Sequence, residues 1–498
     1  MIKKVFAVIL VLTVVVPLTV WGMSGAKVSA ATGYKLEGNV LTITGTGDMD
    51  DYWSLSDIPW YNDKDKIRAV VISSGVTSIG DRAFKGFTVM DVTIPNTVTR
   101  IGDSAFENCT SLYSITMPDS VTQIGKNAFN GCSAMMSITL SKNLEAIPER
   151  AFYKCSKLNE ITIPGSVKSL GYEAFLYCSN LKVNFNEGLE TIEDRVFGGL
   201  YSSYQGITNS EVVIPDSVTS IGEKAFTSNT NITKLTTGKN LKTIGNSAFS
   251  GNVITTIDLS RSTKLETIGE EAFGWSGFTS IVIPDSVTTI GKSAFRNCDN
   301  LTSITLPKNL TSISPWTFFA DELTSIEIPS KVEKIGETAF YSTNLTKVVI
   351  PPSVIEIGKN AFQYCHDLKA LDISSNPYLA LNSNAFGDTS LNHIHIPASR
   401  DSSIYRGQYG LPADESCYFQ IGSDGKCPAA YCPFRDSTGT VGDINGDGKL
   451  NNTDIILLGR AYMAGDGDKY LSVADMNGDG RITNADIILL GRLYMTGK

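Results

Sequence analysis

The sequence has few of the residues that do chemistry in enzymes. It contains only three histidines, His366, His393 and His395. The motifs G-x-S-x-G, H-E-x-x-H and the phosphate-binding loop are absent, so no common hydrolase, zinc protease or nucleotide site is indicated. His393 and His395 flank one residue of a predicted strand and could share a metal ion. No third ligand is evident, however, and we expect the pair to lie on a plain polar outer face. We therefore expect this protein not to be an enzyme.

A second long apolar run is also missing. Lys3 and Lys4 precede an apolar stretch over residues 5–20, and Val28-Ser29-Ala30 is typical of a cleavage site, so residues 1–30 are predicted to be a secretory signal peptide. An uncleaved membrane anchor is the alternative, although the run is short for a spanning helix. Cleavage removes three lysines and no acids, which changes the net charge from −9 to −12. We therefore expect an extracellular protein with no membrane insertion and no nucleic-acid partner.

What the sequence has in abundance is a repeat. A phenylalanine, usually within an Ala-Phe pair, recurs every 22 to 24 residues, with one interval of 29, at Phe84, Phe106, Phe129, Phe152, Phe175, Phe197, Phe226, Phe249, Phe273, Phe295, Phe318, Phe340, Phe362 and Phe386. One repeat cannot bury its own apolar side, so the repeats must stack. In the copy at residues 112–132, Ile115 and Met117 are predicted to face inward on a short strand and Thr116 outward. The segment around Phe129 then returns on a helix-like or irregular turn.

These features predict an α/β repeat solenoid of the leucine-rich-repeat class, with about 14 repeats of 22 to 24 residues over residues 67–399. Residues 31–66 are expected to cap its first coil with a hairpin at Gly38-Asn39 and with aromatic residues that include Trp53 and Trp60. Residues 400–440 break the period and are predicted to be a closing cap followed by a polar linker.

The nine cysteines do not resemble a disulfide framework. Six lie three residues after a repeat phenylalanine and are predicted to be buried thiols, although stacked copies could oxidise or bind a metal: Cys109, Cys132, Cys155, Cys178, Cys298 and Cys365. The other three, Cys417, Cys427 and Cys432, lie in the closing segment. One disulfide among them is plausible, but its pairing cannot be deduced from the sequence.

Aromatic residues collect just after the repeat phenylalanine. If this edge is exposed, they form a discontinuous row that could contact a ligand, consisting of Tyr153, Tyr177, Trp275, Tyr341 and Tyr364. Alternatively, the same side chains could pack over neighbouring coils. The outward strand positions are mostly Thr and Val and include no aromatic residue, so they give no sign of glycan binding.

Residues 33–400 resemble the BspA-like leucine-rich-repeat surface proteins, whose repeat reads much like I-x-I-P-x-S-V-T-x-I-G-x-x-A-F. The segment over residues 112–132 of this chain carries that pattern. The resemblance implies the solenoid fold, and it implies adhesion or the binding of proteins and surfaces by bacteria.

Two acidic loops near the end of the chain match the pattern of calcium-binding loops, because Ca²⁺ requires six or more oxygen ligands at regular spacing. The ligands predicted for two Ca²⁺ ions are Asp443, Asn445, Asp447, Lys449 (carbonyl), Asn451 and Asp454 in the first loop, and Asp475, Asn477, Asp479, Arg481 (carbonyl), Thr483 and Asp486 in the second. Each loop precedes a helix that reads D-I-I-L-L-G-R. This helix is apolar on more sides than so small a domain can bury, which favours a partner.

Residues 441–498 resemble a type I dockerin, a small all-α calcium-binding domain. The resemblance implies calcium-dependent docking to a cohesin domain of a cellulosome scaffoldin. The residues that it implies for cohesin binding are Asn452, Thr453, Leu458, Gly459, Arg460, Asn484, Ala485, Leu490, Gly491 and Arg492. Because the two halves are nearly identical, either helix could lead, which would give two docking orientations.

Together these features predict a secreted, non-catalytic binding rod that is attached to a scaffoldin. Its expected use is attachment to plant cell-wall material, to another cell or to a protein. Two alternatives stay open. One is a polysaccharide hydrolase of unrecognised type, because the separation of paired carboxylates is not visible in sequence. The other is a spacer or assembly subunit.

Overall fold

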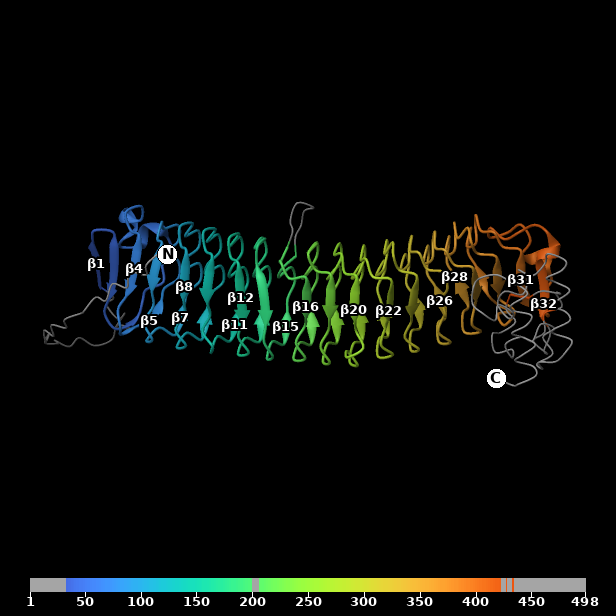
Figure 1. Ribbon diagram of the computed structural model, residues 1–498, viewed down its shortest axis with the longest axis horizontal. Helices are drawn as coiled ribbons and strands as arrows, with labels where there is room; N and C mark the ends of the chain where they lie inside the picture. The colour runs from blue at the N-terminus through green and yellow to red at the C-terminus, as the bar shows by residue number, and fades with distance from the viewer. Residues whose placement is uncertain (1–32, 199–205, 422–426, 428–431, 434–498) are drawn as a thin grey trace, which may run out of the picture.

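The computed structural model describes residues 33–198, 206–421, 427 and 432–433. These residues form a long rod in which the chain winds around the long axis from β1 at one end to β32 at the other (Figure 1). The coil makes about 15 turns, so the predicted repeat solenoid is confirmed. Its core is one continuous apolar cluster that extends from Leu41 to Leu411.

The first side of most coils is a short strand that pairs in parallel with the strand of at least one neighbouring coil, and the coil at residues 321–329 has no strand at this position. Ile115 and Met117 are buried there and Thr116 is exposed, as the alternating pattern predicts. The strands on this side are β2 (Val40–Thr44), β4 (Ala69–Ile72), β6 (Asp91–Thr93), β8 (Ser114–Thr116), β10 (Ser137–Thr139), β12 (Glu160–Ile163), β14 (Lys182–Phe185), β16 (Glu211–Val213), β18 (Lys234–Thr236), β20 (Thr256–Asp258), β22 (Ser280–Val282), β24 (Ser303–Thr305), β27 (Lys347–Val349), β29 (Ala370–Asp372), β31 (His393–Pro397) and β32 (Tyr418–Ile421).

A second strand in each coil, which the sequence pattern did not reveal, ends at the isoleucine of the Ile-Gly pair in most coils. The following glycine lets the coils approach closely, since a Cβ on Gly245 would lie only 2.6 Å from the backbone of Gly222 in the preceding coil. The strands on this side are β3 (Gly47–Asp48), β5 (Val76–Ile79), β7 (Arg100–Ile101), β9 (Gln123–Ile124), β11 (Ala146–Ile147), β13 (Ser169–Leu170), β15 (Thr191–Ile192), β17 (Ser220–Ile221), β19 (Thr243–Ile244), β21 (Thr267–Ile268), β23 (Thr289–Ile290), β25 (Ser312–Ile313), β26 (Lys334–Ile335), β28 (Glu356–Ile357) and β30 (Ala380–Leu381).

The third side of each coil is an irregular turn, and the described residues contain no α-helix. Residues with a positive φ, such as Asn127 at 55° two positions before Phe129, interrupt any helix. The repeat phenylalanines stack behind this turn in an unbroken column from Phe84 to Phe386. The ring centroids of successive members lie 5.0 to 5.8 Å apart. This column explains why the phenylalanine is the most regular feature of the sequence.

The first coil is covered by a hairpin and one tryptophan. Strand β1 (Gly33–Glu37) pairs antiparallel with β2, and the 3₁₀ turns η1 (Leu55–Asp57) and η2 (Tyr61–Asp63) follow. Trp60 is buried, its ring lies 5.8 Å from that of Phe84, and its indole N–H donates a hydrogen bond to the Ala83 carbonyl at 3.1 Å. Trp53 was expected to help cover this coil, but its side chain is 87% exposed. One buried tryptophan therefore closes the phenylalanine column.

The last coil is covered by residues beyond β31. Strand β32 pairs in parallel with β31, and the 3₁₀ turns η3 (Ser402–Ile404) and η4 (Glu415–Cys417) lie between the two strands in sequence. Tyr405 and Leu411 are buried in the continuous core. The rod thus has an apolar closure at each end.

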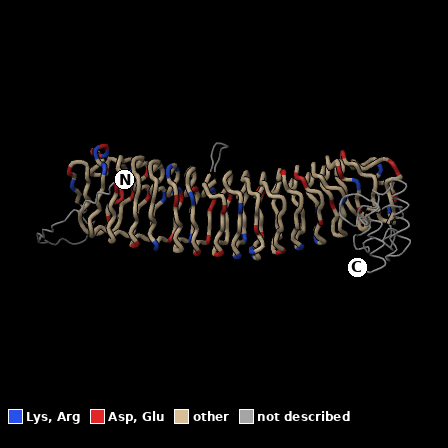
Figure 2. The backbone as a smooth tube through the Cα atoms, viewed as in Figure 1, with Lys and Arg blue, Asp and Glu red and all other residues tan. Residues whose placement is uncertain are grey.

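Charges of both signs are distributed along the whole rod (Figure 2). Many of them pair between neighbouring coils, as Lys126 does with Glu149 at 3.0 Å. In the described part of the chain, no helix is long and apolar enough to cross a membrane.

Candidate functional site

The predicted calcium ligands and cohesin-binding residues belong to residues 441–498, which lie outside the described residues. The same holds for residues 199–205, which belong to the 29-residue interval between Phe197 and Phe226. The five aromatic residues of the predicted ligand face are all described. They form two separate groups on the turn side of the coils.

The first group contains Tyr153 and Tyr177, whose rings meet edge to face with centroids 5.5 Å apart. The guanidinium of Arg150 lies 5.6 Å from the centre of the Tyr153 ring, and it also forms a 2.7 Å ion pair with the buried Glu173. Both tyrosines are half-buried. This group is therefore held by packing and by charge.

The second group is a continuous ridge on five successive coils. We call Trp275, Arg296, Phe319, Tyr341 and Tyr364 the aromatic ridge. The guanidinium carbon of Arg296 lies 4.9 Å from the ring centre of Trp275 and 5.7 Å from that of Phe319. The Phe319 and Tyr341 rings stack at 5.0 Å, and the Tyr341 and Tyr364 rings meet edge to face at 5.1 Å. Each side chain thus contacts the next one along the rod.

The ridge is ordered by mutual packing and still faces solvent. Trp275 is 46% exposed and Tyr364 is 38% exposed, whereas Phe319 and Tyr341 are partly covered by their neighbours. Trp275 and Tyr364 both have a φ of 61°, and this turn directs their side chains away from the core. The sequence left open whether these aromatic side chains are exposed to a ligand or packed over neighbouring coils. In the structure they pack against one another and remain partly exposed.

Sequence reasoning missed Arg296 and Phe319, although they connect the ridge. Phe319 occupies the same repeat position as Tyr341, one residue after the buried phenylalanine, so the register could have identified it. Arg296 stands at that position in the preceding coil. The ion pair between Arg296 and Glu271 at 3.4 Å holds the guanidinium between the two aromatic rings.

The six repeat cysteines are buried free thiols. Desolvation by burial raises the pKa of Cys365 to about 11, and it also raises the pKa of Cys109, Cys132, Cys155 and Cys298. A thiol that stays protonated is a poor metal ligand and a poor nucleophile. These cysteines are therefore part of the core.

The expectation that His393 and His395 form a plain polar face is wrong. Both project from β31 on the side opposite the core residues Ile394 and Ile396, but only 7% and 4% of their surface is exposed. Cys427 and Cys432 lie against them and help to cover them. The exposed His366 lies apart from them, beside Tyr364.

Comparison with known families and structures supports the two-part organisation. A model of the BspA type leucine rich repeat region matches residues 77–203, 200–321 and 288–407, and a model of the dockerin type I domain matches residues 441–493. Neither of these is a catalytic kind of domain. No curated protein matches the chain.

The chain is similar to solved structures of bacterial leucine-rich-repeat proteins. One from Bacteroides ovatus is 26% identical with a TM-score of 0.54, and the match covers 79% of this chain and 98% of that chain. A leucine rich cell surface protein from Faecalibacterium prausnitzii is 27% identical with a TM-score of 0.41, over 69% and 94% of the two chains. The first of these supports the continuous rod described above.

Proposed function

Because this chain belongs to the family defined by the BspA type leucine-rich repeat region and ends in a dockerin type I domain, we propose that it is a secreted, non-catalytic binding subunit of a cellulosome. The dockerin binds a cohesin of the scaffoldin when its loops at residues 443–454 and 475–486 each hold one Ca²⁺ ion. The repeats then present the aromatic ridge to a ligand.

The continuity of the aromatic ridge is the observation that carries the binding role. Tryptophan, tyrosine and arginine are the residues most enriched at the energetic centres of protein interfaces. Five successive coils at a strand spacing of about 4.8 Å give the ridge a length of roughly 20 Å. Its rings are pre-ordered by their neighbours, so little conformational entropy is lost when a partner binds.

The geometry of the ridge favours a protein partner over a polysaccharide. One face of the Trp275 ring lies against the Arg296 guanidinium, and Tyr341 meets Tyr364 edge to face. The ridge therefore offers ring edges and a cation rather than a row of open ring faces. A protein or peptide surface with carboxylates and apolar side chains matches this chemistry.

The ridge is tested with the full chain and two matched double variants. Trp275→Ala with Tyr364→Ala removes both ends of the ridge, and Trp53→Ala with Tyr378→Ala removes one tryptophan and one tyrosine elsewhere that are more exposed than these two. Binding to bacterial cell-surface proteins, cellulose, xylan and pectin is measured for all three proteins. We expect protein binding that only the ridge variant loses. Equal binding by all three proteins contradicts the proposal that the ridge binds a partner. Retention on a polysaccharide that depends on the ridge indicates a role in substrate targeting instead.

The attachment step is tested with a panel of type I cohesins. We expect one or more of them to bind the full chain in Ca²⁺ and to release it in chelator, and we expect Asp443→Ala with Asp475→Ala to abolish binding. Loss of the ridge should leave cohesin binding unchanged. Release of soluble sugar from plant cell wall by the purified chain would support the hydrolase alternative instead.

A further inference from the structure

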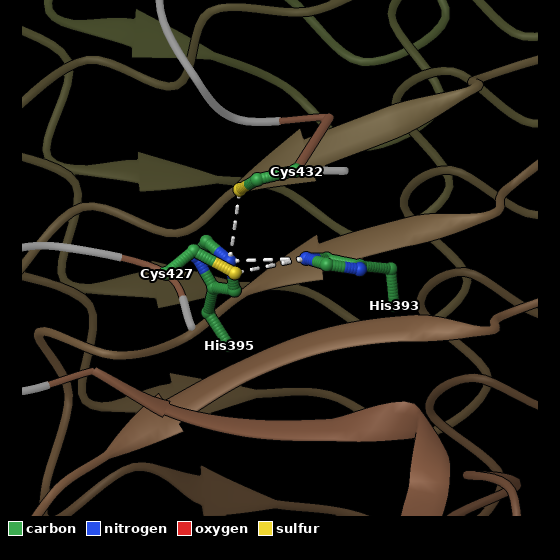
Figure 3. A group of neighbouring side chains, drawn as sticks. All are labelled: His393, His395, Cys427 and Cys432. Atoms are coloured by element: carbon green, nitrogen blue, oxygen red, sulfur yellow. Dashed lines mark hydrogen bonds between the residues drawn. The ribbon is translucent and has the colours of Figure 1, made fainter. Parts of the chain in front are cut away.

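Four buried side chains with metal-binding atoms meet at the C-terminal end of the rod. They are His393 and His395 on β31, together with Cys427 and Cys432, and their donor atoms all lie within 4.8 Å of one another. Figure 3 shows that the four side chains converge, each with its nitrogen or sulfur atom directed at the others. Each is between 4% and 8% exposed.

The distances between these atoms are close to those of a tetrahedral zinc site. Zn–N bonds of about 2.05 Å and Zn–S bonds of 2.3 Å place ligand atoms about 3.3 Å (N···N) and about 3.6 Å (N···S) apart in a tetrahedron. In the structure, the two histidine Nε2 atoms are 3.1 Å apart. Cys427 Sγ lies 3.5 Å from Nε2 of His393, and Cys432 Sγ lies 3.3 Å from Nε2 of His395. These three distances are thus close to those that one ion requires, and all four donor atoms lie within 4.8 Å of one another.

The surroundings also orient one ligand. Nδ1 of His395 lies 3.1 Å from Oδ2 of Asp372, on the neighbouring strand β29, so its Nε2 is directed at the cluster. Asp372 is itself fixed, because the backbone N–H and the hydroxyl of Ser374 donate to its Oδ1 at 2.9 and 2.6 Å. Carboxylate–histidine pairs of this kind support the ligands of many zinc sites.

The second histidine is held by packing. The His393 ring stacks on Phe419 of β32, with the ring centroids 4.3 Å apart and 23° between the planes. The imidazole is therefore fixed on one face by an aromatic ring while its Nε2 points at the cluster. Both histidines are held in place by neighbours in addition to their contacts with the cysteines.

We propose that His393, His395, Cys427 and Cys432 bind one structural Zn²⁺ ion. Two thiolates and two neutral imidazoles around Zn²⁺ give a complex with no net charge, which suits a buried position. Four protein ligands close the coordination sphere, as in structural zinc sites, and leave no position for a substrate. The ion attaches the segment that carries Cys427 and Cys432 to β31, and so fastens the C-terminal closure of the rod.

The first test is the metal content of the full chain after purification with zinc and dialysis into calcium buffer. We expect one zinc per chain, which Cys427→Ser with Cys432→Ser removes. Cys417→Ser and the calcium-loop variant Asp443→Ala with Asp475→Ala should both keep the zinc, since none of these residues is a proposed zinc ligand. A wild-type chain without zinc, or zinc that survives the double cysteine change, overturns the proposal.

A second measurement keeps the test decisive if the cysteine variant folds poorly. Cobalt added to the metal-free wild-type chain should give the strong visible absorption of a tetrahedral ion with thiolate ligands, and zinc should displace it. A weak spectrum of octahedral cobalt, or a disulfide between Cys427 and Cys432 in the zinc-purified protein, contradicts the site.

Asp372→Asn tests the positioning role of the carboxylate. Loss of such a partner typically weakens metal binding by about 10- to 100-fold. We expect that loss in a competition titration with a coloured chelator, with the tetrahedral cobalt spectrum preserved. Asp367→Asn, which changes an exposed carboxylate in the same coil, is the matched control. Unchanged zinc affinity of Asp372→Asn would contradict this role.

Discussion

The thiol of Cys132 donates a hydrogen bond to the carbonyl oxygen of Phe106 in the preceding coil, with 3.2 Å between sulfur and oxygen. The same contact recurs for every repeat cysteine: Cys109 with Phe84, Cys155 with Phe129, Cys178 with Phe152, Cys298 with Phe273 and Cys365 with Phe340. Asn229 and Asn252 make it with their side-chain amides. This repeat position therefore takes a small side chain that can donate a hydrogen bond.

Because the repeat cysteines are buried in the core, we expect their thiols not to react with alkylating reagents in the folded protein. At pH 8, iodoacetamide should modify Cys417, which is partly exposed, and leave the six repeat cysteines intact, because burial blocks access to their thiols. Peptide mass spectrometry identifies the modified residues, and the unfolded chain serves as the control in which every cysteine reacts. Modification of Cys132 or Cys155 in the folded protein would show that this prediction is wrong.

The repeat position also contains one buried acid, Asp321, and this predicts a pH dependence. Desolvation raises the pKa of Asp321 well above its usual value, and Oδ2 has no hydrogen-bond partner among the described residues. An acid whose pKa is raised by folding stabilises the protein fully below the unfolded pKa, and this stability is lost as the pH rises toward the folded pKa. Over that window the loss is about 1.4 kcal/mol per pH unit.

Asp321→Asn should therefore stabilise the protein, and more strongly at pH 8 than at pH 5. The amide keeps the acceptor for the backbone N–H of Cys298, which lies 2.8 Å from Asp321 Oδ1, and it adds a donor as Asn229 does. Urea unfolding across this pH range measures the difference, with the exposed Asp367→Asn as control. A gain that is equal at both pH values would mean that Asp321 is not protonated in the fold.

The contact of Arg296 with Trp275 predicts a spectroscopic change. Arg296→Ala removes the cation from the indole face, so the fluorescence of Trp275 should change, while the free energy of unfolding should fall by only about 1 kcal/mol. In a Trp275→Phe background the same substitution should leave the tryptophan emission unaltered. Emission that changes in that background would assign the signal to another tryptophan.

The near-identity of the two dockerin halves predicts tolerance of single changes. If either half can lead in cohesin docking, Arg460→Ala and Arg492→Ala should each weaken binding only slightly, because the other orientation remains available. The double variant should lose binding. Titration calorimetry with a matching cohesin measures the affinity of all three variants. A large loss of affinity from one single substitution would show that the dockerin docks in only one orientation.

Several features followed from local residue chemistry. The spacing of the repeat phenylalanines indicated stacked coils because a single coil cannot bury its own apolar side. The alternation at Ile115, Thr116 and Met117 indicated which side of the strand faces the core. By contrast, the sequence did not predict the second strand. In most coils this strand has only two residues, which is too short to show an alternation of apolar and polar residues.

The sequence by itself therefore determined the solenoid, its cysteine and phenylalanine columns and the dockerin, since each repeats a local pattern. Only the tertiary structure decided which side chains meet between coils. Arg296 lies between Trp275 and Phe319 because stacking brings residues 21 to 23 positions apart into contact. His393 and Cys427 meet across 34 residues at the closing end of the rod, where the chain has left its period and spacing no longer indicates proximity.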